Sequence, residues 1–151
     1  MLYPLMLKLN NKQVVVVGGG KVALRKVKGL LGTGAKIKAV SPEFLPEFYS
    51  LAEVELVNRV FEAQDVSEAH IVYAATNVPE VNRAVGNVIE HWQWFDDTSF
   101  AEASNFYTPA VVRQDGLILA ISTGGEYPEK AKKLKQQLSE YLHRSNNDII
   151  D

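Results

Sequence analysis

The strongest pattern in the chain is an unbroken apolar run, Val14–Val17, that ends at three consecutive glycines. This run, counted from Gln13, predicts a strand buried on both faces, as strands of parallel sheets are. From about Val22 to Leu31 the apolar residues recur at helical spacing, and charged residues lie between them. A second strand is predicted over residues 35–40. Together these elements occupy about 30 residues, the size of a βαβ unit.

Three more strands are predicted farther along the chain, at residues 54–59, 70–75 and about 92–95. Residues 45–52 are expected to form a short helix and residues 65–69 a turn. A longer helix is predicted to begin at Pro79 and to carry an apolar stripe of Val81, Val85, Val88 and Ile89. The alternation of strands and helices predicts an α/β fold of the Rossmann type, with a doubly wound parallel sheet.

The pattern changes after Asp97. Residues 98–105 are expected to form a loop, and 106–113 and 117–122 two strands joined by an Asp-Gly turn, which predicts a hairpin. Residues 129–143 predict an amphipathic helix, with a frayed end over 145–151. The helix has Ala131, Leu134, Leu138 and Leu142 on one side. We therefore expect a Rossmann domain at 1–110, followed by a hairpin and helix, 111–151, that need another surface to pack on.

Composition narrows the class of protein. The chain is 46% hydrophobic and 23% charged, which is ordinary for a soluble globular protein. A net charge of -2 and a pI of about 5.9 argue against nucleic acid as a partner. No apolar run approaches the ~20 residues of a membrane span, and the N-terminal stretch, broken by Pro4, does not resemble a signal peptide. The absence of cysteine excludes thiolate chemistry and fits a cytoplasmic protein.

The glycines form the pattern Gly18-x-Gly20-x-x-Ala23 between a buried strand and a helix, a context typical of dinucleotide binding. Gly18 permits a tight turn, Gly20 lets the backbone approach a pyrophosphate, and Ala23 lets helix and strand pack closely. Backbone N–H groups at the helix start, at Lys21 and Val22, then face the phosphates. The alternative interpretation is a plain strand-to-helix turn.

The end of the second predicted strand bears on the choice of cofactor. An acid is usual there, but Ser41 and Pro42 occupy the position and Glu43 follows. Glu43 can bind the ribose hydroxyls from a shifted position, or it is a solvated loop residue. Lys21 and Arg25 lie near enough to keep NADP open, but we favour NAD.

The residues at the carboxyl end of the fourth predicted strand are candidates for contact with the cofactor's ring. Ligands of open α/β sheets bind at the carboxyl ends of the strands, and Ala75 and Thr76 are small enough to admit a ring there. The alternative is that the alanines belong to the core. The three histidines, His70, His91 and His143, have no helical i,i+4 spacing, so no metal site is predicted.

Taken together, these segments resemble the precorrin-2 dehydrogenase family, of the siroheme synthase N-terminal type. The segments that carry the resemblance are Val16–Lys26, Ala39–Glu43, Ala74–Asn77, Asn105–Ala110 and Ile121–Gly125 with Pro128. The resemblance implies NAD-dependent oxidation of precorrin-2, a tetrapyrrole, to sirohydrochlorin in siroheme biosynthesis. Some members also insert ferrous iron, so ferrochelatase activity stays open. It further implies a homodimer with residues 111–151 at the interface.

The family's catalytic aspartate precedes the Asn-Phe segment, and here the match is displaced. Counting back from Pro109 without gaps reaches Ser99, whereas a small loop insertion brings in Asp97 or Asp96. We expect Asp97, with Asp96 second, to accept a proton or orient the macrocycle. The alternative is two solvated loop aspartates.

Other positions depart from the family pattern or stay open. The aromatic run Trp92–Phe95 replaces a small aliphatic strand, and longer relatives continue into a helical region that this chain lacks. The resemblance also implies substrate contacts at Asn105, Thr123 and Gly124, although Thr123–Gly125 equally suits a simple turn. A non-catalytic NAD(H)-binding regulatory protein is the alternative function, and a purely structural dimerising module ranks third.

Overall fold

The computed structural model describes residues 2–147 of the chain. The chain divides into two compact units. One is Pro4–Phe106, called here the sheet unit, and the other, the hairpin unit, combines the first three residues with the chain from Tyr107 onward. In the described part of the chain, no helix is both long and apolar enough to span a membrane.

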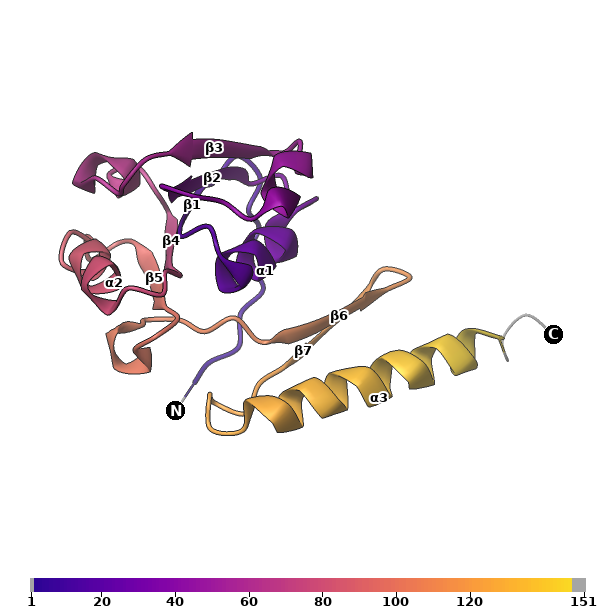
Figure 1. Cartoon of the computed structure of the whole chain (residues 1–151). Coiled ribbons are helices and arrows are strands. Elements are labelled where there is room, and N and C mark those ends of the chain that lie inside the picture. Colours follow the sequence, from indigo (N-terminus) through magenta and orange to yellow (C-terminus); the bar gives the residue numbers. More distant parts are fainter. Residues whose placement is uncertain (1, 148–151) are drawn as a thin grey trace. The chain divides into compact units, whose positions relative to one another are not determined.

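The sheet unit contains a five-stranded sheet in the order β3-β2-β1-β4-β5, in which every neighbouring pair is parallel (Figure 1). Its strands are β1 Gln13–Val17, β2 Lys36–Ser41, β3 Val54–Asn58, β4 Ile71–Ala74 and β5 Trp94–Asp97. Its helices are α1 Lys21–Leu30 and α2 Pro79–Gly86, with 3-10 turns η1 Pro46–Ser50, η2 Ala63–Val66 and η3 Ala101–Ala103. The strand order reverses between β1 and β4, as in a doubly wound sheet. The predicted Rossmann-type fold is confirmed.

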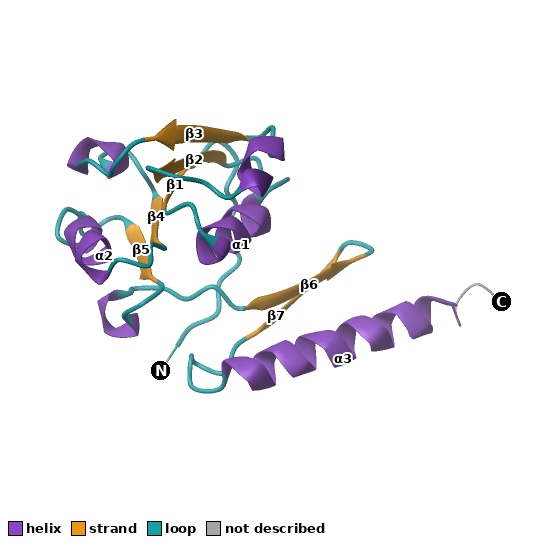
Figure 2. Ribbon diagram, viewed as in Figure 1, coloured by secondary structure: helices purple, strands orange, loops and turns teal. Residues whose placement is uncertain are grey.

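The valines of β1 explain why the first strand is central. Val14 and Val16 pack in the cluster that holds α1, whereas Val15 and Val17 pack in the cluster that includes Val85 of α2. Because successive side chains alternate between the two faces of a strand, four valines in a row supply both faces at once. α1 and α2 thereby cover opposite faces of the sheet (Figure 2).

The fifth strand lies later in the chain than the pattern predicted. The buried amide of Gln93 donates from Nε2 to the carbonyls of Val66 (2.6 Å) and Ala69 (2.8 Å). The side chain of Gln93 is therefore bound to the segment before β4, and β5 begins only at the next residue, Trp94. Asp96 and Asp97 consequently belong to the strand, where each is 5% exposed or less. The interpretation of these residues as solvated loop aspartates is wrong.

The helix that begins at Pro79 is shorter than predicted. It ends at Gly86, and Val88, expected on its apolar stripe, is 37% exposed. A Cβ at Gly86 would lie 3.3 Å from the ring of Phe95, so the close packing of this helix end on β5 favours glycine. Glycine is a poor helix former, and the helix does not continue past it.

The hairpin unit consists of β6 Ala110–Gln114, β7 Leu117–Ile121 and α3 Pro128–Asn147. Asp115 and Gly116 have φ of 50° and 80°, as a two-residue type I′ turn requires, so the predicted hairpin is confirmed. The first strand starts at Ala110 rather than 106, because the ring of Phe106 stays in the sheet unit. α3 contacts β6 and β7. It continues to Asn147, so fraying is wrong for 145–147, and 148–151 lie outside the described residues.

Candidate cofactor site

The glycine turn lies where the strand order of the sheet reverses. Gly18 has φ of 133°, and a Cβ on it would collide with the carbonyl oxygen of Ala75, which follows β4. The Gly18 N–H donates to the carbonyl of Val40 in β2 (2.9 Å). Only glycine meets both the backbone conformation and the close approach. The turn therefore lies against the ends of two neighbouring strands, at the position where open α/β sheets bind ligands.

Gly19 lies in the predicted glycine turn, but the sequence pattern assigned it no contact of its own. A Cβ there would collide with the carbonyl oxygen of Glu43 and lie 2.8 Å from the Ser41 hydroxyl. The Gly19 carbonyl accepts a hydrogen bond from the Leu45 N–H (3.0 Å). Gly-x-Gly motifs leave the middle position free, whereas a third consecutive glycine is the signal that could have revealed this contact.

Gly20 is open where its neighbours are crowded. Apart from its two chain neighbours, no atom of the described residues lies within 4 Å of the position that its Cβ would occupy. It is the N-cap of α1, and among the described residues no side chain caps this helix end. The first-turn N–H groups, which lack intrahelical acceptors, thus lie at the positive end of the helix beside exposed Lys21. These features fit the pyrophosphate of a dinucleotide.

The loop after β2 brings one carboxylate to this edge of the sheet. Ser41 is buried, and its hydroxyl donates to the Glu43 carbonyl (2.7 Å), which fixes the Ser41–Glu43 turn against Gly19. Pro42 and Glu43 are exposed. The Ser41 hydroxyl hydrogen is therefore used within the protein, and Glu43 is the residue of this turn whose side chain can meet ribose hydroxyls.

Thr76 is held entirely by its neighbours. Its N–H and its hydroxyl both donate to Oδ1 of Asn82, at 3.2 and 2.7 Å, and the hydroxyl accepts from the Val78 N–H (3.1 Å). The side chain of Thr76 thus shapes the loop after β4. We expect Ala75 and Thr76 to offer backbone rather than side-chain contacts to a ring. Asn82, which is 1% exposed, was not identified from the sequence.

Asp97 and Asp96 are adjacent in β5 and therefore point to opposite faces of the sheet. Oδ1 of Asp97 accepts hydrogen bonds from the Ser99 N–H (2.8 Å), the Ser99 hydroxyl (2.7 Å) and the Phe100 N–H (3.1 Å). This carboxylate closes the turn that follows β5. Its burial thus has a structural explanation.

Asp96 has a different partner. Its Oδ2 lies 2.6 Å from Nζ of Lys26 in α1, and both side chains are nearly buried, at 7% and 12% exposure. The Lys26 ammonium also lies 4.9 Å from the centre of the Tyr73 ring. This ion pair joins the helix of the glycine turn to the strand that carries both carboxylates.

The three predicted substrate contacts are divided between the two units. Asn105 accepts from the Phe95 N–H (2.8 Å) and donates to the Gln93 carbonyl (2.9 Å), so its amide holds the edge of β5. In the hairpin unit, Thr123 Oγ1 accepts from the Tyr127 N–H (3.2 Å), and Gly124 has φ of 69°. These two residues form the turn into α3, which was the alternative interpretation for them.

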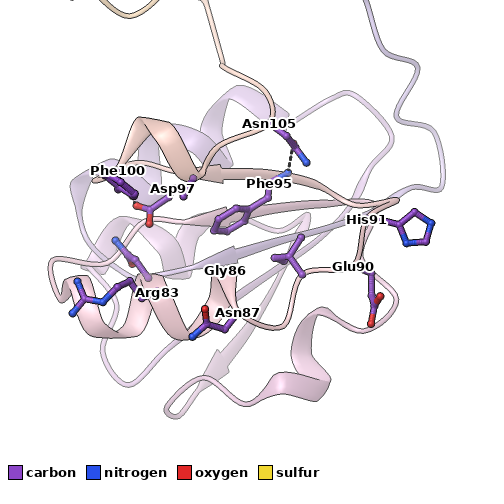
Figure 3. A pocket seen from close by; sticks show the side chains of 12 residues that line it. Arg83, Gly86, Asn87, Glu90, His91, Phe95, Asp97, Phe100 and Asn105 are labelled. Atoms are coloured by element: carbon purple, nitrogen blue, oxygen red, sulfur yellow. Dashed lines mark hydrogen bonds between the residues drawn. The ribbon is translucent and has the colours of Figure 1, made fainter.

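A cavity of about 430 Å³ lies on the α2 side of β5 (Figure 3). Asp97, Asn105 and Phe95 contribute to its wall. The glycine turn does not line it, so this cavity is distinct from the candidate cofactor site. Within residues 2–147, no three histidine, aspartate or glutamate side chains gather in a way that could hold a metal ion.

Comparison with known proteins identifies the class first. A family model described as "Putative NAD(P)-binding" matches residues 5–110, in agreement with the Rossmann-type sheet and glycine turn. The chain is thus an NAD(P)-binding protein.

Individual relatives narrow the family. Precorrin-2 dehydrogenase of Bacillus subtilis is 32% identical over 142 residues, which cover 92% of this chain and 88% of that protein. Siroheme synthase of Chromobacterium violaceum is 34% identical, over 93% of this chain but only 31% of that protein. The structure of SirC, a precorrin-2 dehydrogenase, matches with a TM-score of 0.83 at 32% identity, covering 93% of this chain and 71% of that chain. The chain belongs to the family of precorrin-2 dehydrogenases and siroheme synthases, as its motifs predicted.

Proposed function

We propose that this protein oxidises precorrin-2 to sirohydrochlorin with NAD, in siroheme biosynthesis. The observation that carries the proposal is the uncapped start of α1 at Gly20, which lies at the strand-order reversal of a sheet whose β5 carries two buried carboxylates. The identity of the substrate, precorrin-2, is inferred from the relatives that are named precorrin-2 dehydrogenase. The dependence on NAD and the absence of cysteine fit a cytoplasmic enzyme.

Residues of the sheet unit would hold the cofactor. The first-turn N–H groups of α1 bind the pyrophosphate, with Gly18 and Gly20 allowing its approach. Glu43 binds the ribose hydroxyls and thereby favours NAD over a cofactor with a 2′-phosphate. Ala75 and Thr76 border the nicotinamide. When bound, NAD supplies the acceptor for the hydride that leaves the substrate.

The oxidation removes two hydrogens, one as the hydride and the other as a proton. A carboxylate at the end of β5 can accept that proton or orient the macrocycle. The sequence favoured Asp97, but its Oδ1 already closes the following turn with three hydrogen bonds. We therefore propose Asp96 as the acting carboxylate, with Lys26 as the neighbouring charge that holds it in place.

The test is anaerobic incubation of the protein with precorrin-2 and NAD, following NADH and sirohydrochlorin by absorbance. Formation of both in equal amounts would support the dehydrogenase. Tight NADH binding without product would instead favour the alternative, a regulatory NAD(H)-binding protein. Failure to bind NADH would exclude both the dehydrogenase and the regulatory protein, and would leave a structural role.

We also propose that the protein is a homodimer that associates through the hairpin unit. A two-stranded sheet is marginally stable alone and needs further surface to pack on. α3 packs along β6, where Val112 is buried. Ile118 of β7 pairs with Arg113 of β6 and therefore lies on the same face of the hairpin as Arg113. Because Arg113 is next to Val112, this face is opposite to that of Val112, and Ile118 is 46% exposed on it. A second copy of the chain would bury this open face.

A further inference from the structure

The side chain of Asn82 links two loops at the carboxyl edge of the sheet. Asn82 belongs to α2 and is almost fully buried. Its Oδ1 accepts from the Thr76 N–H and hydroxyl, and its Nδ2 donates to the Thr76 carbonyl (3.3 Å) and to the Ser99 hydroxyl oxygen (3.0 Å). One amide therefore contacts the loop after β4 and the turn after β5.

The direction of these hydrogen bonds requires an amide. Nδ2 carries two hydrogens, and both have acceptors, in Thr76 and Ser99. Because the Ser99 oxygen accepts from Asn82, its own hydrogen is free to go to Asp97 Oδ1 (2.7 Å). A carboxylate at position 82 would keep the bonds from Thr76 but lose the bond to the Thr76 carbonyl, which can only accept. It could meet the Ser99 hydroxyl only by taking the hydrogen that now goes to Asp97. The bonds from Thr76 to Asp97 thus form one continuous chain.

We infer that Asn82 is a positioning residue, which holds the Thr76 loop at a fixed distance from the Asp97 turn and so aligns the nicotinamide-binding edge with the β5 carboxylates. The inference rests on the proposed function, because that function places the nicotinamide beside Thr76. Asn82 need not touch the cofactor or the substrate. Its amide acts through Thr76 on one side and through Ser99 on the other.

Two ligands separate this role from a merely structural one. ADP-ribose occupies the glycine turn but has no nicotinamide, whereas NADH reaches the Thr76 loop. In Asn82→Asp we expect the Kd for NADH to rise about tenfold, the size of one lost hydrogen bond, while the Kd for ADP-ribose stays unchanged. The matched control is Asn87→Asp, which makes the same change at an exposed residue just beyond the same helix.

A second variant tests the other half of the chain of hydrogen bonds. Ser99 is exposed, so Ser99→Ala should fold normally. It removes the link from Asn82 to the Asp97 turn, which directly follows the proposed acting carboxylate Asp96, but not the link to Thr76, so kcat should fall about tenfold with the Kd for NADH unchanged. This variant also decides the inference if Asn82→Asp does not fold.

The inference is overturned if Asn82→Asp weakens NADH and ADP-ribose equally, or if Ser99→Ala retains full kcat. These outcomes are separate from the fate of the proposed function. If the wild-type protein binds NADH but does not oxidise precorrin-2, the dehydrogenase proposal fails, whereas the ratio of the two Kd values still decides the role of Asn82.

Discussion

Gly19 and Gly20 are neighbours in sequence but face opposite constraints. The Cβ of an alanine at 19 would collide with the Glu43 carbonyl, whereas at 20 it would enter open space at the start of α1. Gly20→Ala should therefore leave the melting temperature nearly unchanged and weaken NADH binding at least about tenfold, because the methyl group occupies the approach of the pyrophosphate. Titration of NADH and thermal unfolding measure the two effects.

Gly19→Ala is the matched variant, and we expect it to reduce mainly the stability of the protein rather than its affinity for NADH. The collision with backbone should lower the free energy of unfolding by about 1–3 kcal/mol, with any loss of NADH affinity secondary to it. Equal stability of the two variants would contradict this description of the turn.

Experiments should also distinguish the roles of the two aspartates of β5. Asp96→Asn keeps the size of the side chain but removes its charge, so we expect kcat to fall about 100-fold or more with the Kd for NADH little changed. Asp97→Asn can still accept hydrogen bonds from Ser99 and Phe100, and should lower kcat less than Asp96→Asn. A larger loss of kcat in Asp97→Asn would restore Asp97 as the acting residue.

At this scale the sequence predicted residue types better than their contacts. The spacing of Gly18, Gly20 and Ala23 follows from the needs of a strand-turn-helix and was readable in advance. The partner of Asp96 was not readable, because Lys26 lies 70 residues earlier and only the packing of α1 on the sheet brings the two together. The partners of Thr76 and Asn105 are closer in sequence, but these contacts depend on how the loops after β4 and β5 fold.

Among the elements, η2 is held by an ion pair with several hydrogen bonds. Oδ1 and Oδ2 of buried Asp65 pair with the Arg59 guanidinium at 2.7 and 2.8 Å, and Oδ2 also accepts from the Glu62 N–H (2.9 Å). The hydrogen bonds from Arg59 lower the pKa of Asp65 against the opposing effect of its burial, and the Glu62 N–H and Lys38 lower it further. The carboxylate thus joins the edge of the sheet to the turn before β4.

A lowered pKa in the folded state means that the stabilisation from Asp65 is present above the unfolded pKa, near 4, and is lost as pH falls through the lower folded value. Asp65→Asn should therefore reduce the free energy of unfolding by about 1–3 kcal/mol at neutral pH. The difference between variant and wild type should shrink below about pH 4, as measured by urea unfolding over a pH series. A difference that does not change with pH would contradict the ionic contribution.

The elements themselves were predicted most accurately where local pattern and burial agree. β1, α1 and the hairpin turn follow from four valines, a helical stripe and an Asp-Gly pair. The observed bounds of β5 and α2 differ from the predicted ones because they depend on contacts with residues of other elements. The amide of Gln93 binds carbonyls more than 20 residues earlier, and Gly86 packs on Phe95.

For the whole molecule, association is the property most open to test. Ile118→Glu places a charge on the open face of the hairpin, so we expect the dimer dissociation constant to rise at least about tenfold. Lys135→Glu, on an exposed position of α3, is the control and should leave it unchanged. Light scattering across a concentration series measures both. A monomeric wild-type protein would contradict the homodimer proposal.

The division of the chain into two units also has a consequence for synthesis. The sheet unit is one unbroken stretch, Pro4–Phe106, whereas the hairpin unit draws on both ends of the chain. A ribosome delivers residues in order, and domains tend to fold as they emerge. The nucleotide-binding unit is therefore able to close, and to gain stability from any NAD it captures, before the chain from Tyr107 onward has been translated. In the proposed homodimer, a nascent chain would then acquire its cofactor first and its second copy afterwards.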